Sequence, residues 1–289
     1  MMEPNYLAAV DDGLICRPAG LWAKEKLDYL LRYMNTFETS MRNKWPERNY
    51  IDLFAGPGKN CSISDHSKQI FLGSPLLALN VKYPFSGYYY SEIDPQLKEV
   101  LEKRCSASPL FNSLHFYEGD ANDVVKIIVR RIHQFSPNSL NLAFLDPEGL
   151  ELEWSTVAEL AKLRCDLIIY YSQGGFERNI KGFFESNRDT RADLFFGTRD
   201  WKKIYEPWYT KTETSGLHRD LIDYYKERLK NLGYVRVEQS DEISTEPLIR
   251  STKKNAPLYR LIFASKHSLG EDFWRKIIKR DIHGQQQLF

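Results

Sequence analysis

Up to Tyr171, short apolar runs alternate with amphipathic helical patterns along the chain. The apolar runs predict strands at Tyr50–Phe54, Tyr88–Glu92, His115–Glu118, Leu140–Leu145 and Leu167–Tyr171. Between them, apolar residues at helical spacing predict helices at Ser74–Lys82, Pro95–Arg104, Asp123–Phe135 and Trp154–Leu163. Strands that are apolar on both faces and joined by helices indicate a parallel sheet that is covered on both sides.

The pattern differs at the two ends of the chain. Residues 1–20 contain several prolines and glycines and predict an irregular arm, which a helix follows from Ala23. Residues 172–232 show helical patterns and no convincing strand. Two more strands are predicted at Tyr234–Val237 and Leu258–Ser265, and a last helix lies near Glu271–Lys279.

Together these patterns predict an α/β fold with a doubly wound, mostly parallel sheet of seven strands and an inserted helical cap. We expect an N-terminal arm and helix over residues 1–49 and a cofactor-binding core over 50–171. A helical insertion over 172–232 follows, and residues 233–289 hold the last strands of the core, a C-terminal helix and a tail.

The first predicted strand runs into a glycine-containing loop, the segment 52–58, which reads DLFAGPG. Glycines at the carboxyl end of the first strand let the backbone approach a ligand closely, where doubly wound sheets bind cofactors. The nicotinamide fingerprint requires a further glycine at the position of Cys61, so a dinucleotide fits poorly. Residues 60–72 read as an insertion that delays the next helix.

Acidic residues follow the second and third strands. Glu92, ahead of Ile93, can accept hydrogen bonds from both hydroxyls of a ribose. Asp120, ahead of Ala121, can accept from an adenine amino group. With Asp52 they form three acids at one edge of the sheet. The alternative is that each acid only caps a helix or forms a turn.

This ordered set resembles the class I S-adenosylmethionine-dependent methyltransferases, over about Tyr50 to Ser265. The resemblance implies a Rossmann-like methyltransferase fold with S-adenosylmethionine (SAM) as cofactor. The cofactor-binding residues that it implies are Asp52, Phe54, Ala55, Gly56, Gly58, Glu92, Ile93, Asp120, Ala121 and Asp146.

The fourth strand ends in the segment 145–149, which reads LDPEG. It is similar to the Asp-Pro-Pro-Tyr motif of amine-modifying methyltransferases, in which the carboxylate and a nearby carbonyl aim an amine at the sulfonium methyl group. Such catalysis rests mainly on positioning. The resemblance makes Asp146, Pro147 and Glu148 the catalytic candidates. The Asp-Pro-any-Gly form looks more like the tRNA guanine-N2 dimethyltransferases, and a plain strand-to-helix turn is the alternative.

Motifs along nearly the whole chain resemble one specific family, the three-Cys-motif partner proteins (TcmP). These motifs read LWAKEKL at 21–27, YIDLFAGPG at 50–58, LDPEG at 145–149 and IFASKH at 262–267. The resemblance implies a partner protein with a three-cysteine cluster, an iron–sulfur radical enzyme. The substrate-binding candidates are Trp22, Lys26, Gln173, Arg178 and Asn179.

Gln173, Arg178 and Asn179 lie on either side of a glycine pair, Gly174 and Gly175, after the fifth strand. This segment is equally consistent with a hinge into the insertion. The insertion interleaves basic residues such as Arg188 and Arg191 with aromatic residues. Basic side chains for phosphates beside aromatic rings for stacking favour a nucleic-acid substrate, with the insertion covering the active site. The alternative is an amphipathic cap whose aromatic residues form a core.

Composition sets further bounds. The chain of 289 residues has a net charge of +1, so its overall charge does not indicate nucleic-acid binding. A local basic face on the surface remains compatible with nucleic-acid binding. The four cysteines and six histidines are scattered and fit no paired metal-ligand spacing, so we expect free thiols and no metal site. No signal peptide or membrane span is visible, and we expect a soluble, cytoplasmic protein without membrane association.

The last five residues read QQQLF. Gln285 followed by Leu288 and Phe289 resembles the short peptide that bacterial replication proteins insert into the sliding clamp. In that case the clamp is a partner and the protein acts near DNA. A frayed terminus whose apolar residues fold back on the domain is the alternative.

The leading hypothesis is a SAM-dependent methyltransferase that acts on a nucleic-acid base amine, in DNA or RNA, or on a related nitrogen. It would work with the three-cysteine iron–sulfur partner. The alternative is a SAM-binding accessory subunit of a radical enzyme, without methyl transfer of its own. A binding module that has lost turnover is the third possibility, and the intact acid set disfavours it.

Overall fold

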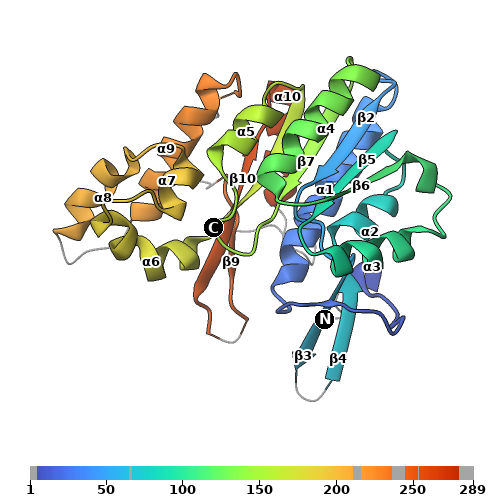
Figure 1. The fold of residues 1–289 in the computed structure, drawn as a ribbon, viewed down its shortest axis with the longest axis horizontal. Coiled ribbons are helices and arrows are strands. Elements are labelled where there is room, and N and C mark those ends of the chain that lie inside the picture. The colour runs from blue at the N-terminus through green and yellow to red at the C-terminus, as the bar shows by residue number, and fades with distance from the viewer. Residues whose placement is uncertain (1–4, 65–66, 211–215, 236–244, 253, 280–289) are drawn as a thin grey trace.

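The computed structural model describes residues 5–64, 67–210, 216–235, 245–252 and 254–279. A seven-stranded sheet forms its centre (Figure 1), in the order β6-β5-β2-β7-β8-β10-β9. Its strands are β2 (Arg48–Asp52), β5 (Gly87–Glu92), β6 (Leu114–Glu118), β7 (Leu140–Leu145), β8 (Cys165–Tyr171), β9 (Leu248–Arg250) and β10 (Pro257–Ala264). The first five in spatial order are parallel, and β10 is antiparallel to both of its neighbours. The predicted doubly wound, mostly parallel α/β fold is confirmed.

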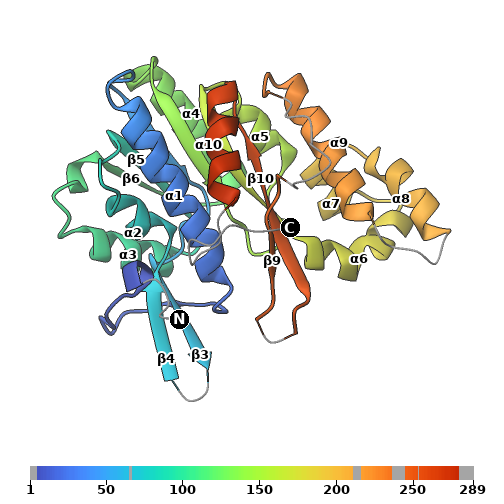
Figure 2. The same cartoon turned by 180° about the vertical axis from the view of Figure 1, so that it is seen from behind.

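Helices cover both faces of this sheet. The helices α4 (Ala121–Phe135) and α5 (Trp154–Leu160) pack on the face seen in Figure 1. The opposite face carries α1 (Ala23–Met41), α2 (Ser74–Leu79), α3 (Pro95–Cys105) and α10 (Ser268–Ile278), of which α1 and α10 lie in front in Figure 2. Each layer encloses its own apolar core, because the central strands are apolar on both faces.

Capping side chains set where two helices begin. The Asp120 carboxylate accepts a hydrogen bond from the Asn122 amide, so α4 starts earlier than its apolar pattern predicts. The His267 ring accepts one from the Leu269 amide at the start of α10.

A second, three-stranded sheet lies beside the glycine loop and was not predicted. Its order is β1-β3-β4, with β1 (Arg17–Pro18), β3 (Lys59–Ser64) and β4 (Ser67–Leu72). The arm therefore contributes a strand, and the predicted insertion at residues 60–72 contains the antiparallel strands β3 and β4, referred to below as the hairpin β3–β4. A short 3-10 helix, η1 (Asn5–Leu7), begins the described arm. The hairpin escaped prediction because its sequence has little regular apolar alternation.

The insertion is helical, as predicted, with α6 (Gln173–Glu185), α7 (Arg191–Phe196), α8 (Trp201–Tyr209) and α9 (Leu217–Asn231). Its aromatic residues Phe195, Phe196 and Trp201 are at most 1% exposed and belong to the core beneath α4 and α5. These three rings are therefore not free to stack on bases. The alternative of an amphipathic unit with an aromatic core describes them correctly.

The end of the chain departs from one predicted strand. Tyr234 and Val235 are not in a strand, residues 236–237 lie outside the described part, and the seventh strand is β9 instead. Three residues with a bulge in the pairing to β10 are too short to give a periodic signal. The clamp-like motif at Gln285, Leu288 and Phe289 also lies outside the described residues and stays a prediction. Among the described helices, none is long and apolar enough to cross a membrane.

Candidate functional site

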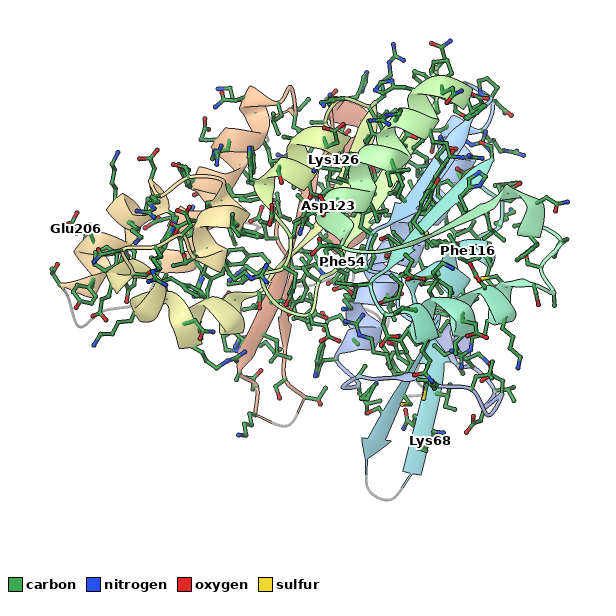
Figure 3. All side chains as sticks on the ribbon, viewed as in Figure 1. Phe54, Lys68, Phe116, Asp123, Lys126 and Glu206 are labelled. Carbon is green, nitrogen blue, oxygen red and sulfur yellow. The ribbon has the colours of Figure 1, made fainter. Side chains whose placement is uncertain are left out.

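The candidate site lies where the strand order reverses between β2 and β7. The chain leaves β2 toward β5 on one side, while β7 pairs with β2 on the other, so the carboxyl ends of both strands meet at a switch point. A cavity of about 800 Å³ opens there. Its wall combines the glycine loop after β2, residues 146–148 after β7, the start of α1, the arm and the hairpin. Figure 3 shows Phe54, one of its lining residues, near the middle of the molecule.

The two glycines of the loop differ in how closely other side chains pack against them. Gly56 and Gly58 have φ angles of 63° and 85°, the left-handed region that favours glycine. A Cβ atom on Gly58 would lie 2.9 Å from Leu101 and 3.0 Å from Leu76, so this glycine allows close packing. At Gly56 the nearest atom would be 3.7 Å away, on Arg17. Gly56 therefore presents bare backbone to the cavity.

Asp52 stabilises the turn after β2 by hydrogen bonding from its buried side chain. Its side chain is fully buried, and it accepts hydrogen bonds from the Phe54 amide at 3.3 Å and the Tyr50 hydroxyl at 3.2 Å. Burial raises the pKa of Asp52 to about 7, and the nearby charge of Asp146 adds to the effect. Asp52 is a cofactor-binding candidate that does not itself line the cavity.

Glu92 connects the second strand to the glycine loop. Its Oε2 accepts a hydrogen bond from the Gly56 amide at 2.8 Å, and its Oε1 accepts one from the Asp94 amide at 3.0 Å. Each carboxylate oxygen has a second lone pair, so the group can still accept from a ligand hydroxyl. Ile93 beside it is 64% exposed, an apolar surface next to the acid.

Asp120 follows β6, the outermost strand of this half of the sheet, and lies at the start of α4. It is exposed, and its carboxylate accepts from the Asn122 amide at 2.8 Å, while Ala121 is buried. The capping role that the sequence left open is therefore realised. It leaves the second carboxylate oxygen available to a ligand. Neither residue belongs to the cavity wall.

Asp146 and Lys26 form an ion pair in the cavity wall. The Lys26 Nζ lies 2.7 and 2.5 Å from the two Asp146 oxygens, and the side chains are 13% and 11% exposed. The rings of Trp22, Tyr170 and Tyr259 surround the ammonium at 6.0, 5.6 and 5.4 Å. These distances are in the range of cation–π contact. The structure thus brings together three residues that the sequence singled out, Trp22, Lys26 and Asp146.

A second ion pair, between Arg17 and Glu148, also lies in the cavity wall. The Arg17 guanidinium donates to Glu148 Oε1 from Nε at 3.0 Å and from Nη2 at 2.7 Å. The Arg17 side chain is 25% exposed and that of Glu148 is 76% exposed. Sequence reasoning missed Arg17, which lies in the arm, and Tyr170, which lies within a strand. Pro147 between the two acids is buried.

Three further substrate candidates lie away from the cavity, at the start of α6. Gln173 accepts a hydrogen bond from Arg260 at 3.0 Å, and Asn179 donates one to the Gly175 carbonyl within the helix. Arg178 is exposed. Of the described residues, none within 172–232 lines the cavity, so the insertion does not form its wall, contrary to the prediction that it covers the site.

Comparisons with known proteins find similar solved structures at low identity. No family model matches the chain, and no curated protein matches it in sequence. Protein LPL1258 from Legionella pneumophila is a similar solved structure, at 10% identity over 90% of each chain, with a TM-score of 0.48. The O-methyltransferase TomG from Streptomyces achromogenes, in complex with SAM, is 12% identical over 90% of this chain and 82% of its own, with a TM-score of 0.41.

A third similar structure is TYW2 from Pyrococcus horikoshii in complex with MeSAdo. It is 12% identical and covers 91% of this chain and 73% of its own, with a TM-score of 0.39. The fold assignment therefore rests on the strand order, and any function rests on the residues of the cavity. The resemblance to the TcmP family rests on its sequence motifs.

Proposed function

We propose that the protein is a SAM-dependent methyltransferase that acts on a nitrogen atom. The observation that carries this proposal is that the glycine turn and the Asp146 carboxylate both line one cavity. A glycine turn follows β2, and the Asp146 carboxylate follows β7, at the switch point of the sheet. A volume of about 800 Å³ falls in the range of small-molecule sites.

The residues present fit the cofactor. Gly56 leaves its backbone open to the cavity. Glu92 lies just outside the cavity wall, where it accepts a hydrogen bond from the Gly56 amide and can also accept from ribose hydroxyls. Ile93 offers an apolar surface beside it. When bound, SAM supplies a methyl group on a positively charged sulfur, which is already an activated leaving group.

Asp146 is the residue that would orient the acceptor. Lys26 fixes the carboxylate through both of its oxygens, and each oxygen keeps a lone pair that can accept from a substrate amine. Trp22 and Tyr170 line the same cavity and give it an aromatic wall beside Asp146. An amine on a nucleic-acid base is the acceptor class that this set of residues supports best.

A specific observation also favours the second candidate, a SAM-binding accessory subunit without methyl transfer. Lys26 engages both oxygens of Asp146, so the chain's own amine already occupies the place proposed for the substrate amine. The TcmP resemblance supports a three-cysteine iron–sulfur partner for either candidate. Copurification of the tagged protein with such a partner tests that part.

The test of the function uses binding and transfer side by side. Calorimetry with SAM and with S-adenosylhomocysteine should show binding, whereas NAD should give no heat. Labelled methyl transfer to cellular DNA and RNA, analysed by mass spectrometry, should fall at least about 100-fold in Asp146→Asn with little change in cofactor affinity. Binding without transfer, with and without the partner, selects the accessory role. Absence of binding by either ligand refutes both candidates.

A further inference from the structure

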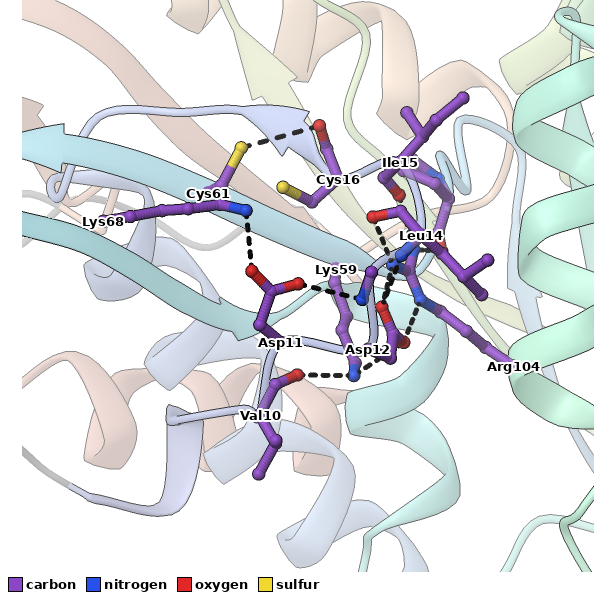
Figure 4. A network of polar contacts seen from close by, with 12 residues as sticks. Val10, Asp11, Asp12, Leu14, Ile15, Cys16, Lys59, Cys61, Lys68 and Arg104 are labelled. Atoms are coloured by element: carbon purple, nitrogen blue, oxygen red, sulfur yellow. Dashed lines mark hydrogen bonds and ion pairs between the residues drawn. The ribbon is translucent and has the colours of Figure 1, made fainter.

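The N-terminal arm is fixed against the glycine loop by hydrogen bonds and ion pairs of Arg104 and Lys59 (Figure 4). The Arg104 side chain, 3% exposed, donates to the Pro57 carbonyl of the loop at 2.5 Å and to the Ile15 carbonyl of the arm at 2.8 Å. It also pairs with Asp12 at 2.8 Å, and Lys59 of β3 pairs with the same carboxylate at 2.8 Å. These contacts hold the arm in place as part of the cavity wall.

The Arg17 side chain of the arm lies beside Gly56 of the glycine loop. Its Nη1 lies 3.7 Å from the position of a Cβ atom on Gly56. Burial lowers the pKa of the guanidinium, but the charges of Asp146, Glu148 and Glu92 outweigh it and leave the pKa above its ordinary value. The guanidinium thus stands among the acids of β5 and β7, over the glycine turn.

Among the described residues, three cationic side chains line this cavity, those of Arg17, Lys26 and Lys59, and their partners distinguish them. Lys26 is held by the buried Asp146 and three rings. Lys59 points to the arm, where it bonds to the Val10 carbonyl and Asp12. Arg17 alone of these three pairs with a carboxylate, Glu148, that is mostly in water.

Glu148 is 76% exposed, so water solvates its carboxylate when this ion pair opens, and pairs to such exposed groups contribute little to stability. Glu148 can therefore return to solvent at small cost. Arg17 would remain in place, because β1 is paired with β3 and the Ala19 amide bonds to the Cys61 carbonyl. Arg17 is the cation of the cavity that can exchange its partner for an anionic ligand group.

We propose that Arg17 binds the carboxylate of the cofactor's methionine part, so that the N-terminal arm belongs to the cofactor site. The inference rests on the proposed function, which supplies a ligand with an amino-acid carboxylate. A guanidinium offers two parallel donors to such a group and releases Glu148 as it does so. The adenosine part would lie toward Glu92, which is bound to the same glycine turn.

The test compares two probes that differ in this carboxylate. S-adenosylhomocysteine carries it, and 5′-methylthioadenosine lacks the whole amino-acid group. In calorimetry, Arg17→Met should weaken S-adenosylhomocysteine about 10- to 100-fold and leave 5′-methylthioadenosine nearly unchanged. Glu148→Gln removes the competing carboxylate and should strengthen S-adenosylhomocysteine binding alone.

Lys68→Met is the matched control, because Lys68 pairs with Asp11 of the same arm but does not line the cavity. It should change neither affinity. Equal weakening of both probes by Arg17→Met would mean that Arg17 only shapes the arm, and unchanged affinities would mean that it has no role; either result overturns the proposal. Wild-type protein that binds neither probe removes the cofactor site itself, and this proposal with it.

Discussion

At the scale of single residues, the glycine loop offers a matched pair of substitutions. Gly56→Ala and Gly58→Ala both place a side chain in left-handed backbone, which costs about 1–2 kcal/mol each. Gly58→Ala also drives a methyl group against Leu101 and Leu76, and such overpacking costs a further ~1–3 kcal/mol. We expect a lower urea midpoint for Gly58→Ala than for Gly56→Ala, with unchanged slopes. Equal midpoints would contradict this account of the loop.

The Lys26–Asp146 pair makes a second prediction at this scale. Lys26→Met leaves the Asp146 charge in the cavity wall without its cation, and breaking a buried pair in this way costs about 3–5 kcal/mol. The double variant Lys26→Met/Asp146→Asn should recover most of that loss. Urea unfolding of the double-mutant cycle measures the coupling. Lys203→Met is the control, since its ion pair with Asp200 is exposed and should contribute little to stability. A double variant no more stable than Lys26→Met excludes the coupling.

At the scale of elements, the docking of α10 on the sheet depends on pH through Glu271. The side chain is 5% exposed and accepts a hydrogen bond from the Ser265 amide at 3.3 Å. Burial raises its pKa from 4.5 to about 8, against a lowering by Lys226. Between these values the folded state holds a proton that the unfolded chain releases. The free energy of unfolding therefore falls as the pH rises through this window.

Glu271→Gln keeps the acceptor and removes the titration. Its free energy of unfolding should vary less with pH between about 5 and 8 than that of the wild type, and the variant should be the more stable at the upper end. Urea unfolding across this range measures both slopes. Asp272→Asn, at an exposed position of the same helix, should retain the wild-type slope. Identical slopes for all three proteins would rule out Glu271 as the titrating group.

Elements also differ in how far the sequence predicts them. The parallel strands and their helices were predictable because runs such as Leu140–Leu145 are apolar on both faces. The two-residue strand β1 and the polar hairpin β3–β4 have no such signal, since their pairing depends on tertiary contacts. The residues of the candidate site also differ in how far the sequence predicts them. Asp146 and the glycine loop lie in recognisable motifs, whereas Arg17 meets Glu148 from 131 positions away.

At the scale of the whole molecule, the switch-point edge of the sheet is extended by two hairpins. The hairpins β3–β4 and β9–β10 project in the same direction in both views (Figures 1 and 2). Asn60 and Cys61 from one, and Ser251 and Thr252 from the turn of the other, line the same cavity. The arm is attached to the first hairpin, where the Ala9 amide bonds to the Ile70 carbonyl. Segments distant in sequence therefore build the cavity around the motif residues of the sheet.

This arrangement predicts that the arm can loosen without unfolding the sheet. Arg104→Leu removes the donor shared by the arm and the glycine loop and leaves Asp12 and the Pro57 carbonyl without it. Local opening of the arm should then become easier, while the contacts of the main sheet persist. We expect amide exchange over residues 8–19 to accelerate about tenfold or more, which corresponds to ~1.4 kcal/mol. Exchange in β7 and β8 should not change.

Lys103→Leu controls for the loss of charge, because Lys103 is the exposed neighbour of Arg104 on α3. It should leave exchange in the arm at the wild-type rate. If the arm is part of the cofactor site, Arg104→Leu should also weaken S-adenosylhomocysteine binding. The ligand must then order the loosened arm, and the entropy lost in this ordering reduces the free energy of binding. Acceleration that is equal in the arm and in β7 would show that Arg104 stabilises the whole domain, and the separate opening of the arm would be wrong.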